Sequence, residues 1–203
     1  YIMEESYFDT LKKAIQTDNV VKKTRAAGNW FRTLANRAKA ALSNEKSPQK
    51  LLSREDTVGK YIPGKMYFFS YNPKWKNILP YYDTFPLVIP IERYKDGFLG
   101  INFHYLYPKD RAILMDQIKA YANNKKYDKT TRLIMTYNML KGFSKHKRAR
   151  PTIHRYLNNK INSMFVPIEA DEWGVALFLP VERFKKANKK AVWEESKKIY
   201  NKR

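Results

Sequence analysis

Residues 61–108 constrain the fold more than any other stretch of this chain. Three short apolar runs, rich in aromatic and β-branched residues, lie there between turn signals, and such runs suit a pleated, half-buried surface. An Asp-Gly pair separates the second run from the third. It is a strong signal for a β-hairpin, because glycine accepts the positive φ that a tight turn requires. The three runs cover residues 65–71, 85–93 and 97–106.

Four prolines interrupt the same stretch. Because proline has no backbone N–H, we expect these residues at strand starts, at sheet edges or in loops, and not inside a central ladder. They are Pro73, Pro80, Pro86 and Pro90. The pattern predicts an α+β fold, with a small antiparallel β-sheet or a partly open barrel on which helices pack.

The N-terminal region is predicted to form a helical arm. Residues 6–18 and 20–42 both place apolar residues at helical spacing, and in the second segment the basic residues fall mostly off the apolar stripe. Such a basic amphipathic helix can lie on DNA, on a membrane surface or in the groove of a partner, or it can be an ordinary packing helix. Its many alanines and small bulk favour docking on a neighbouring subunit, so oligomerisation through the arm is one expectation.

The segment 43–60 shows no sustained periodicity and is predicted to be a linker or an ordered loop. We place a domain boundary near Gly59. Residues 1–58 would then form the helical arm and linker, and residues 59–203 the α+β core domain.

Helices are also predicted in the second half of the chain, over 109–124 and 128–142, in a short helix that starts at Pro151, and in a basic helix within 181–203. Residues 164–184 return to β character. Two interpretations remain open there: a pair of strands, or one helical turn that Asp171 opens before a buried apolar run.

Positive charge is the strongest compositional feature. The chain has 40 Lys and Arg against 19 Asp and Glu, for a formal net charge of +21. Residues 109–160 alone hold 14 basic and 3 acidic residues, so about half of the surplus lies in about a quarter of the chain. A domain this basic attracts polyanions, and the release of their counterions drives binding. The alternatives are solubility and docking onto an acidic protein.

Several classes of protein are disfavoured by what the sequence lacks. The chain has no cysteine, which excludes disulfides, thiolate zinc sites and cysteine nucleophiles. No apolar run approaches the ~20 residues of a membrane span, and we expect neither a signal peptide nor a membrane partner. Neither a glycine-rich phosphate loop nor a Gly-x-Ser-x-Gly motif occurs. We expect no cofactor and no metal, and we interpret His104 as a core or edge histidine.

The segment 141–155 is the best candidate for contact with a polyanion, because it combines many basic residues with no acidic one. Phe143 and Tyr156 are close enough in sequence to stack on a base or a ribose. The alternative is a solvated basic loop between two helices. The predicted DNA-binding residues are Lys141, Lys145, His146, Lys147, Arg148, Arg150 and Arg155.

A nuclease is the enzymatic alternative, because converging carboxylates can hold Mg²⁺. The sequence does not favour it. Glu92 is followed by Arg93-Tyr94-Lys95 and so lacks the Glu-x-Lys pairing of a restriction-type nuclease. We therefore expect no enzyme and no catalytic residues. The carboxylates considered were Asp83, Glu92, Asp96, Glu169, Asp171 and Glu172.

Three stretches together resemble a known family. They read GKMYFFSYNPKWKNILPYYDTFPLVIPIE, GFLGINFHYLYPKDRAILMD and FVPIEADEWGVALFLPVERFKKA. The pattern resembles the virion proteins of T4-like tailed bacteriophages, of the DNA end protector type, over roughly residues 59–191. The resemblance implies a virion component that binds the ends of packaged genomic DNA, shields them from host exonuclease, and is present in the host cytoplasm during assembly. It implies no catalytic residues.

The main hypothesis is therefore a non-enzymatic phage virion structural protein. It would bind double-stranded DNA ends at head completion or at the head–tail junction, next to portal, neck or tail subunits. Its DNA contacts would be tolerant of sequence and sensitive to salt, because backbone contacts carry little base information. The alternative is a neck, tail or baseplate adaptor that docks on acidic virion subunits without touching DNA.

Overall fold

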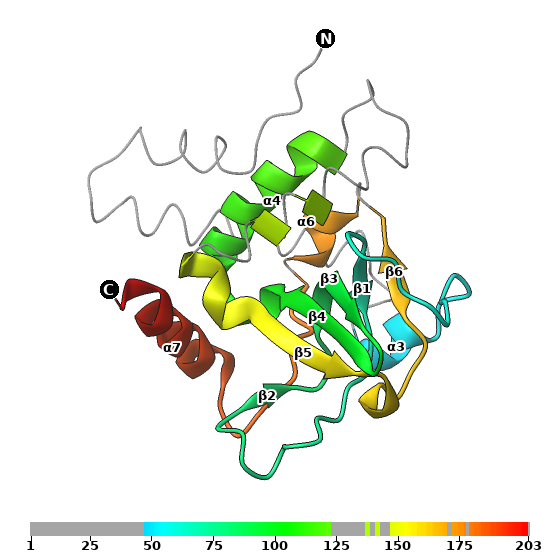
Figure 1. The fold of residues 1–203 in the computed structure, drawn as a ribbon, viewed down its shortest axis with the longest axis horizontal. Coiled ribbons are helices and arrows are strands. Elements are labelled where there is room, and N and C mark those ends of the chain that lie inside the picture. The colour runs from blue at the N-terminus through cyan, green and yellow to red at the C-terminus, as the bar shows by residue number, and fades with distance from the viewer. Residues whose placement is uncertain are drawn as a thin grey trace.

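The structure is a computed structural model, and it describes residues 47–122, 137–138, 141–142, 147–169, 172–177 and 179–202. These residues form an open five-stranded antiparallel sheet and a second sheet of two strands, with helices packed against them (Figure 1). The predicted α+β class is confirmed, and the sheet is not closed into a barrel. Both predicted helices of the N-terminal arm, and most of the helix predicted over 128–142, lie outside the described residues.

The strands within the described residues are β1 Met66–Phe68, β2 Tyr82–Asp83, β3 Leu87–Tyr94, β4 Gly97–Asn102, β5 Ile153–Leu157, β6 Val166–Ile168 and β7 Phe184–Lys185. The large sheet has the order β5-β4-β3-β1-β6, and β2 pairs with β7 in the small one. All neighbours run antiparallel. The sheet topology therefore brings together strands that are far apart in the chain.

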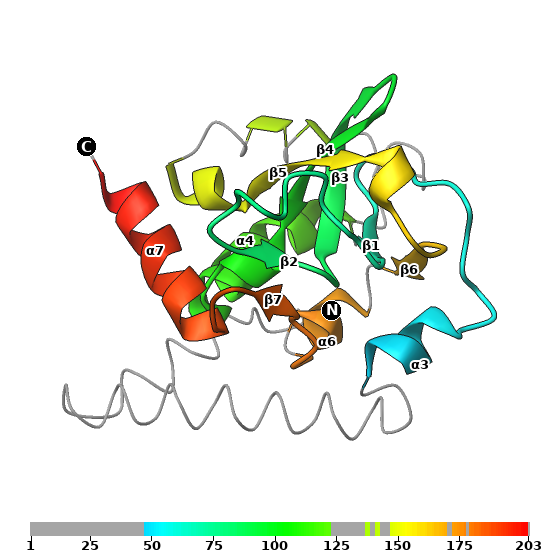
Figure 2. The same ribbon diagram turned by 90° about the horizontal axis from the view of Figure 1, so that it is seen from below.

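The predicted hairpin is confirmed, but our reason for its glycine is wrong. Tyr94 pairs with Gly97, so Lys95 and Asp96 form the turn, which projects beyond the rest of the sheet (Figure 2). Gly97 does not have a positive φ. A Cβ atom there would instead lie 1.9 Å from the carbonyl oxygen of Tyr156. Glycine is needed because β5 approaches the β4 backbone closely, and not because of the turn.

Pro90 also departs from expectation, because it lies inside the central strand β3. The register of β3 and β4 shifts between Pro90 and Glu92, which marks a β-bulge. On the other side of β3, β1 pairs only with Leu87 and Val88, and the Pro90 carbonyl accepts a hydrogen bond from the Gly64 N–H at 2.8 Å. The missing N–H is tolerated because no paired β1 residue lies opposite it.

The large sheet carries an apolar layer on each face, since successive strand residues point to opposite sides. The first layer packs the sheet against helices and includes Met66, Phe68, Leu87, Ile89, Ile101, Leu114, Met115 and Trp173. The second layer is mainly aromatic and consists of Tyr67, Phe69, Tyr71, Val88, Phe98, Tyr156 and Phe165. Its rings meet mostly edge to face, as between Phe69 and Tyr156 at 5.4 Å.

The α-helices are α3 Pro48–Leu52, α4 Pro108–Ala122, α6 Trp173–Ala176 and α7 Lys189–Asn201, and the 3-10 helices are η1 Phe103–Tyr105, η2 Lys147–Thr152 and η3 Asn158–Lys160. The predicted helix after residue 108 is confirmed, with Pro108 at its start. The predicted C-terminal basic helix is confirmed as α7, capped by the Asn188 side chain. Among the described helices, none is both long enough and apolar enough to span a bilayer.

Two predicted elements are wrong, and the structure decides between the two interpretations of a third segment. The segment that follows Pro151 is strand β5, not a helix, because Ile153–Leu157 pairs with residues 97–101 of β4. The segment expected to be a linker or loop contains helix α3, and Leu51 of α3 is buried in the first apolar layer. Of the two interpretations of residues 164–184, the helical turn is correct: α6 forms there, and Leu177, Leu179 and Val181 are buried after it.

The small sheet is anchored by the buried carboxylate of Asp83. Its Oδ1 accepts a hydrogen bond from the Phe85 N–H at 3.0 Å, and its Oδ2 accepts one from Asn102 Nδ2 at 3.1 Å. His104 Nδ1 lies 2.7 Å from the same Oδ2, and the His104 side chain is fully buried. The histidine expected in the core is thus confirmed as a core residue, although it lies in η1 and not in a strand.

Arg111 of α4 is a second buried charge that joins distant segments. Its guanidinium donates to the carbonyl oxygens of His104, Leu106 and Leu177 at 2.8–3.1 Å. It also forms an ion pair with Glu182 at 3.1 Å. One side chain therefore links η1, the α6 region and the segment that leads to β7, because guanidinium offers five donors in a fixed plane.

Replacing Asp83 with asparagine should lower the free energy of unfolding by about 3 kcal/mol, because His104 and Asn102 would lose their charged acceptor inside the core. Urea denaturation followed by circular dichroism measures this change. The control is Asp96→Asn, which removes a carboxylate that is 64% exposed. Asp96→Asn should lower the free energy of unfolding by no more than about 1 kcal/mol. Equal losses for the two variants would contradict the anchoring role of Asp83.

The same substitution should show a defined pH dependence. Burial alone would raise the pKa of Asp83, but contact with His104 and hydrogen bonds from Asn102 and Phe85 outweigh burial, and the pKa is lowered. The stabilisation from Asp83 is therefore complete above the ordinary aspartate pKa and is lost as pH falls through the lowered value. The stability difference between the wild type and Asp83→Asn should narrow over that acid range. A constant difference would show that the charge of Asp83 does not matter.

Gly97→Ala should lower the free energy of unfolding by about 2 kcal/mol or more, because the new methyl group would overlap the Tyr156 carbonyl and separate β4 from β5. Gly59→Ala is the matched control. Its Cβ would lie 3.7 Å from the flexible end of Met164, and it should change stability by less than about 1 kcal/mol. Thermal unfolding of the two variants compares them directly. A stable Gly97→Ala protein would refute the close approach of β5.

Candidate nucleic-acid interface

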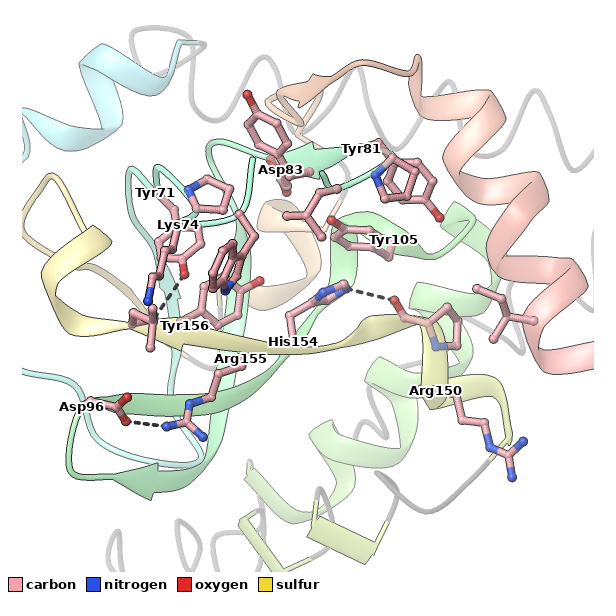
Figure 3. A pocket seen from close by; sticks show the side chains of 18 residues that line it. Tyr71, Lys74, Tyr81, Asp83, Asp96, Tyr105, Arg150, His154, Arg155 and Tyr156 are labelled. Carbon is pink, nitrogen blue, oxygen red and sulfur yellow. Dashed lines mark hydrogen bonds and ion pairs between the residues drawn. The ribbon is translucent and has the colours of Figure 1, made fainter. Parts of the chain in front are cut away.

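A cavity of about 640 Å³ lies between β5, the segment that leads into β2, and the end of α7 (Figure 3). β5 is an edge strand, paired on one side with β4. His154 and Tyr156 are two residues apart and therefore point to the same side of β5, where both line the cavity. The strand thus supplies one wall, composed of aromatic rings.

The opposite wall is the segment 71–81, which does not continue as a strand because Pro73 and Pro80 interrupt it. Tyr71, at its start, accepts a hydrogen bond from the Leu157 N–H at 3.2 Å and so ties the segment to the end of β5. Trp75 lines the cavity and is nevertheless 59% exposed. The segment therefore presents a large aromatic side chain at the mouth of the cavity.

Lys186 holds this segment in place. It follows β7, and its ammonium group donates to the carbonyl oxygens of Asn77 at 3.1 Å and Leu79 at 2.9 Å. Its backbone has a φ of 68°, a conformation that a residue other than glycine adopts only at some cost. The small sheet therefore positions the cavity wall through one charged side chain.

Most of the interior of the cavity is aromatic, and its rings are uncharged at neutral pH, while the buried carboxylate of Asp83 also lines it. The rings of Tyr105 and His154 are 4.1 Å apart, and those of Tyr71 and Tyr156 are 4.9 Å apart. Burial lowers the pKa of His154 to about 4, and the His154 Nε2 lies 3.0 Å from the carbonyl oxygen of Pro151. Burial also raises the pKa of Tyr71, Tyr105 and Tyr156. Near neutral pH these groups therefore carry no charge.

Charged groups are found at the rim. The ammonium group of Lys74 lies 4.8 Å from the centre of the Trp75 ring. Arg155 forms an ion pair with Asp96, and its guanidinium lies 3.9 Å from the centre of the Tyr94 ring. The rim thus combines cations with one exposed carboxylate, Asp96.

The structure brings two of the predicted DNA-binding residues to this cavity. Arg155 and Arg150 lie at opposite ends of it, and the Arg150 guanidinium points away from the interior (Figure 3). Lys141 and Lys147 are exposed, in a helical segment and in η2. Arg148 also belongs to η2, while Lys145 and His146 lie outside the described residues. These seven residues are therefore not gathered into one described cluster.

Lys74 and Trp75 are among the residues that line the cavity and were not predicted. A signal for them exists in the sequence, where Trp75 stands between two lysines just after Pro73. A basic and aromatic loop that proline keeps out of the sheet is typical of an exposed contact segment. Tyr156, which we considered for stacking, does line the cavity, whereas Phe143 lies outside the described residues.

The carboxylates considered for a nuclease site do not converge within the described residues. Asp83 is buried against His104, and Asp96 is paired with Arg155 at the hairpin turn. The described part of the chain holds no group of three or more His, Asp or Glu side chains that could bind a metal ion. Asp171 lies outside that part.

Comparison with known proteins identifies the family of the chain. No curated protein and no solved structure matches the chain. A family model described as phage T4 terminal DNA protecting protein matches residues 2–203, which is nearly the whole chain. The chain belongs to this family of phage T4 terminal DNA protecting proteins.

Proposed function

We propose that the protein binds the ends of double-stranded virion DNA and shields them from host exonuclease. The observation that carries this proposal is the family match over nearly the whole chain. A net charge of +21 supports it, because phosphate contacts provide most of the affinity in DNA binding that does not depend on sequence. The role requires occupancy of the end and no chemistry, so we assign no catalytic residue.

Exposed basic side chains around η2 support the proposal that this surface contacts DNA. Lys147 and Arg150 are both exposed, and Arg150 borders the cavity. Exposed cations next to an aromatic cavity suit a ligand that has a charged backbone and flat bases. We propose that the predicted set in 141–155 contacts the DNA backbone, with Lys141, Lys145, His146, Arg148 and Arg155 completing it.

The proposed place of action is the virion, at head completion or at the head–tail junction. There the DNA end lies close to portal, neck or tail subunits, which are the protein partners we propose. The N-terminal arm, residues 1–58, is proposed to mediate contact between subunits. During assembly the protein would act in the host cytoplasm.

Binding of the wild-type protein to open-ended linear duplex DNA should be tighter than to closed circular DNA of the same sequence. Affinity should fall steeply with salt, because each neutralised phosphate releases counterions. Binding assays across a salt series test this, together with digestion of the linear duplex by a processive exonuclease. Equal affinity for circular and linear DNA would contradict end protection. No binding even at low salt would favour the adaptor that docks on acidic subunits.

The double variant Lys147→Gln/Arg150→Gln should reduce the slope of log affinity against log salt by about 1 to 2, as expected for the loss of one or two phosphate contacts. The matched control is Lys50→Gln/Lys60→Gln. It removes the same charge from two exposed positions, Lys50 in α3 and Lys60 in the segment after it, both outside the 141–155 set. If both variants change the slope equally, the effect comes from net charge and not from the η2 surface.

A further inference from the structure

We propose that the cavity receives one unpaired terminal nucleotide of a DNA strand, with its base among the aromatic side chains and a phosphate beside Lys74. This inference rests on the function proposed above and names the part of the DNA end that is held. It would explain how the protein distinguishes an end from the interior of a duplex.

The volume of the cavity suits a single nucleotide. Its volume of about 640 Å³ falls within the range of about 300–1,000 Å³ that is usual for small-ligand sites. A base inside a duplex is paired and stacked on both sides, so it cannot enter the cavity without being extruded. A terminal nucleotide has lost one stacking neighbour, and an overhanging one has no pairing partner. Entry is therefore easiest at an end.

The aromatic side chains suit a base without selecting its identity. Tyr81 and Tyr105 lie 6.0 Å apart between ring centres, and the Tyr105 ring lies 4.1 Å from His154 (Figure 3). Trp75 is 59% exposed at the mouth, so much of its ring is available for stacking. Stacking on aromatic rings tolerates every base, because each base has a π face.

The charges around the cavity place the phosphate near Lys74. Lys74 is the exposed lysine of the lining, and no other side chain neutralises it among the described residues. Asp83 also lines the cavity, but its carboxylate is occupied by hydrogen bonds from Phe85, Asn102 and the Arg183 N–H, besides its contact with His104. Asp96 is the remaining acid, and Arg155 offsets it.

Three fluorescent duplexes of one sequence test the inference on the full chain by anisotropy. The first has both ends closed by hairpin loops, and the second has blunt ends. The third carries one unpaired nucleotide at each end. It is prepared in two versions, with the unpaired nucleotide at the 3′ position in one and at the 5′ position in the other. We expect the closed duplex to bind most weakly. The unpaired nucleotide should tighten binding at least about fivefold over the blunt end, because no base pair has to open.

Trp75→Ala should abolish the preference for the unpaired nucleotide over the blunt end, and Trp75→Phe should keep part of that preference. The matched control is Ile78→Ala. Ile78 is 76% exposed in the same segment and does not line the cavity. Lys74→Gln should weaken the preference more than Lys76→Gln, which removes the same charge two residues away. Circular dichroism verifies that each variant is folded.

The outcomes separate the two proposals. If both open-ended duplexes bind better than the closed one but equally to each other, the end-binding function stands and the cavity inference is overturned. If all three duplexes bind equally, end binding itself fails and the inference falls with it. If Ile78→Ala removes the preference as strongly as Trp75→Ala does, the segment acts through its shape and the stacking role is overturned.

Asp96→Asn should strengthen DNA binding, whereas the substitutions above should weaken the preference for the unpaired nucleotide. Removing this carboxylate should free Arg155 and reduce repulsion at the rim, so the duplex with unpaired nucleotides should bind roughly two- to fivefold more tightly. Asp56→Asn is the control, since Asp56 is exposed, pairs with Arg54 and lies outside the cavity lining. Equal effects of the two substitutions would overturn the placement of the phosphate at this rim.

Discussion

The arrangement of the other elements depends on the hydrogen bonds and the ion pair that the buried guanidinium of Arg111 forms. Its side chain is 1% exposed, and it contacts the carbonyl oxygens of His104, Leu106 and Leu177 as well as the carboxylate of Glu182. A buried charge is costly unless its donors are satisfied, and the geometry here satisfies them. These acceptors come from segments far apart in the chain, so the guanidinium is fully hydrogen-bonded only when all of the segments are in place. A partly folded arrangement would leave some of its donors unsatisfied and is therefore disfavoured.

This constraint extends to the cavity through His104. The carbonyl oxygen of His104 accepts hydrogen bonds from Arg111 and from Trp193 of α7, while the His104 ring contacts Asp83 of β2. Tyr105 follows directly in the chain and forms part of the cavity interior. The aromatic lining is therefore supported by a network of polar contacts below it. The position of Tyr105 in the lining therefore depends on the buried contacts of His104.

Much of the fold could be predicted from local patterns, and the errors have physical causes. The hairpin between β3 and β4 and the helices α4 and α7 follow from turn residues, capping residues and apolar spacing, all of which are local. β5 was predicted to be a helix because the apolar residues of 153–161 fit a helical period, whereas its pairing with β4 is a long-range interaction that no local pattern records. Gly97 shows the same limit, because its requirement comes from a strand about sixty residues away.

The candidate interface was only partly predictable for a similar reason. Basic residues are visible in a sequence, but the cavity is formed by aromatic residues that local patterns assign to strands and core. Asp83 was considered as a metal ligand because it is an acid near other acids. In the fold its carboxylate is occupied by neighbouring donors. Lys74 and Trp75 become prominent only when Pro73 and Pro80 are seen to keep their segment out of the sheet, beside β5.

The protonation of the cavity has a consequence for the conditions in which the protein can work. His154 has a pKa of about 4, and burial raises the pKa of the neighbouring tyrosines Tyr71, Tyr81 and Tyr105. From mildly acidic to mildly alkaline surroundings, none of these groups gains or loses a proton. Across that range, a change in the acidity of the surroundings therefore leaves the charge state of these lining groups unaltered.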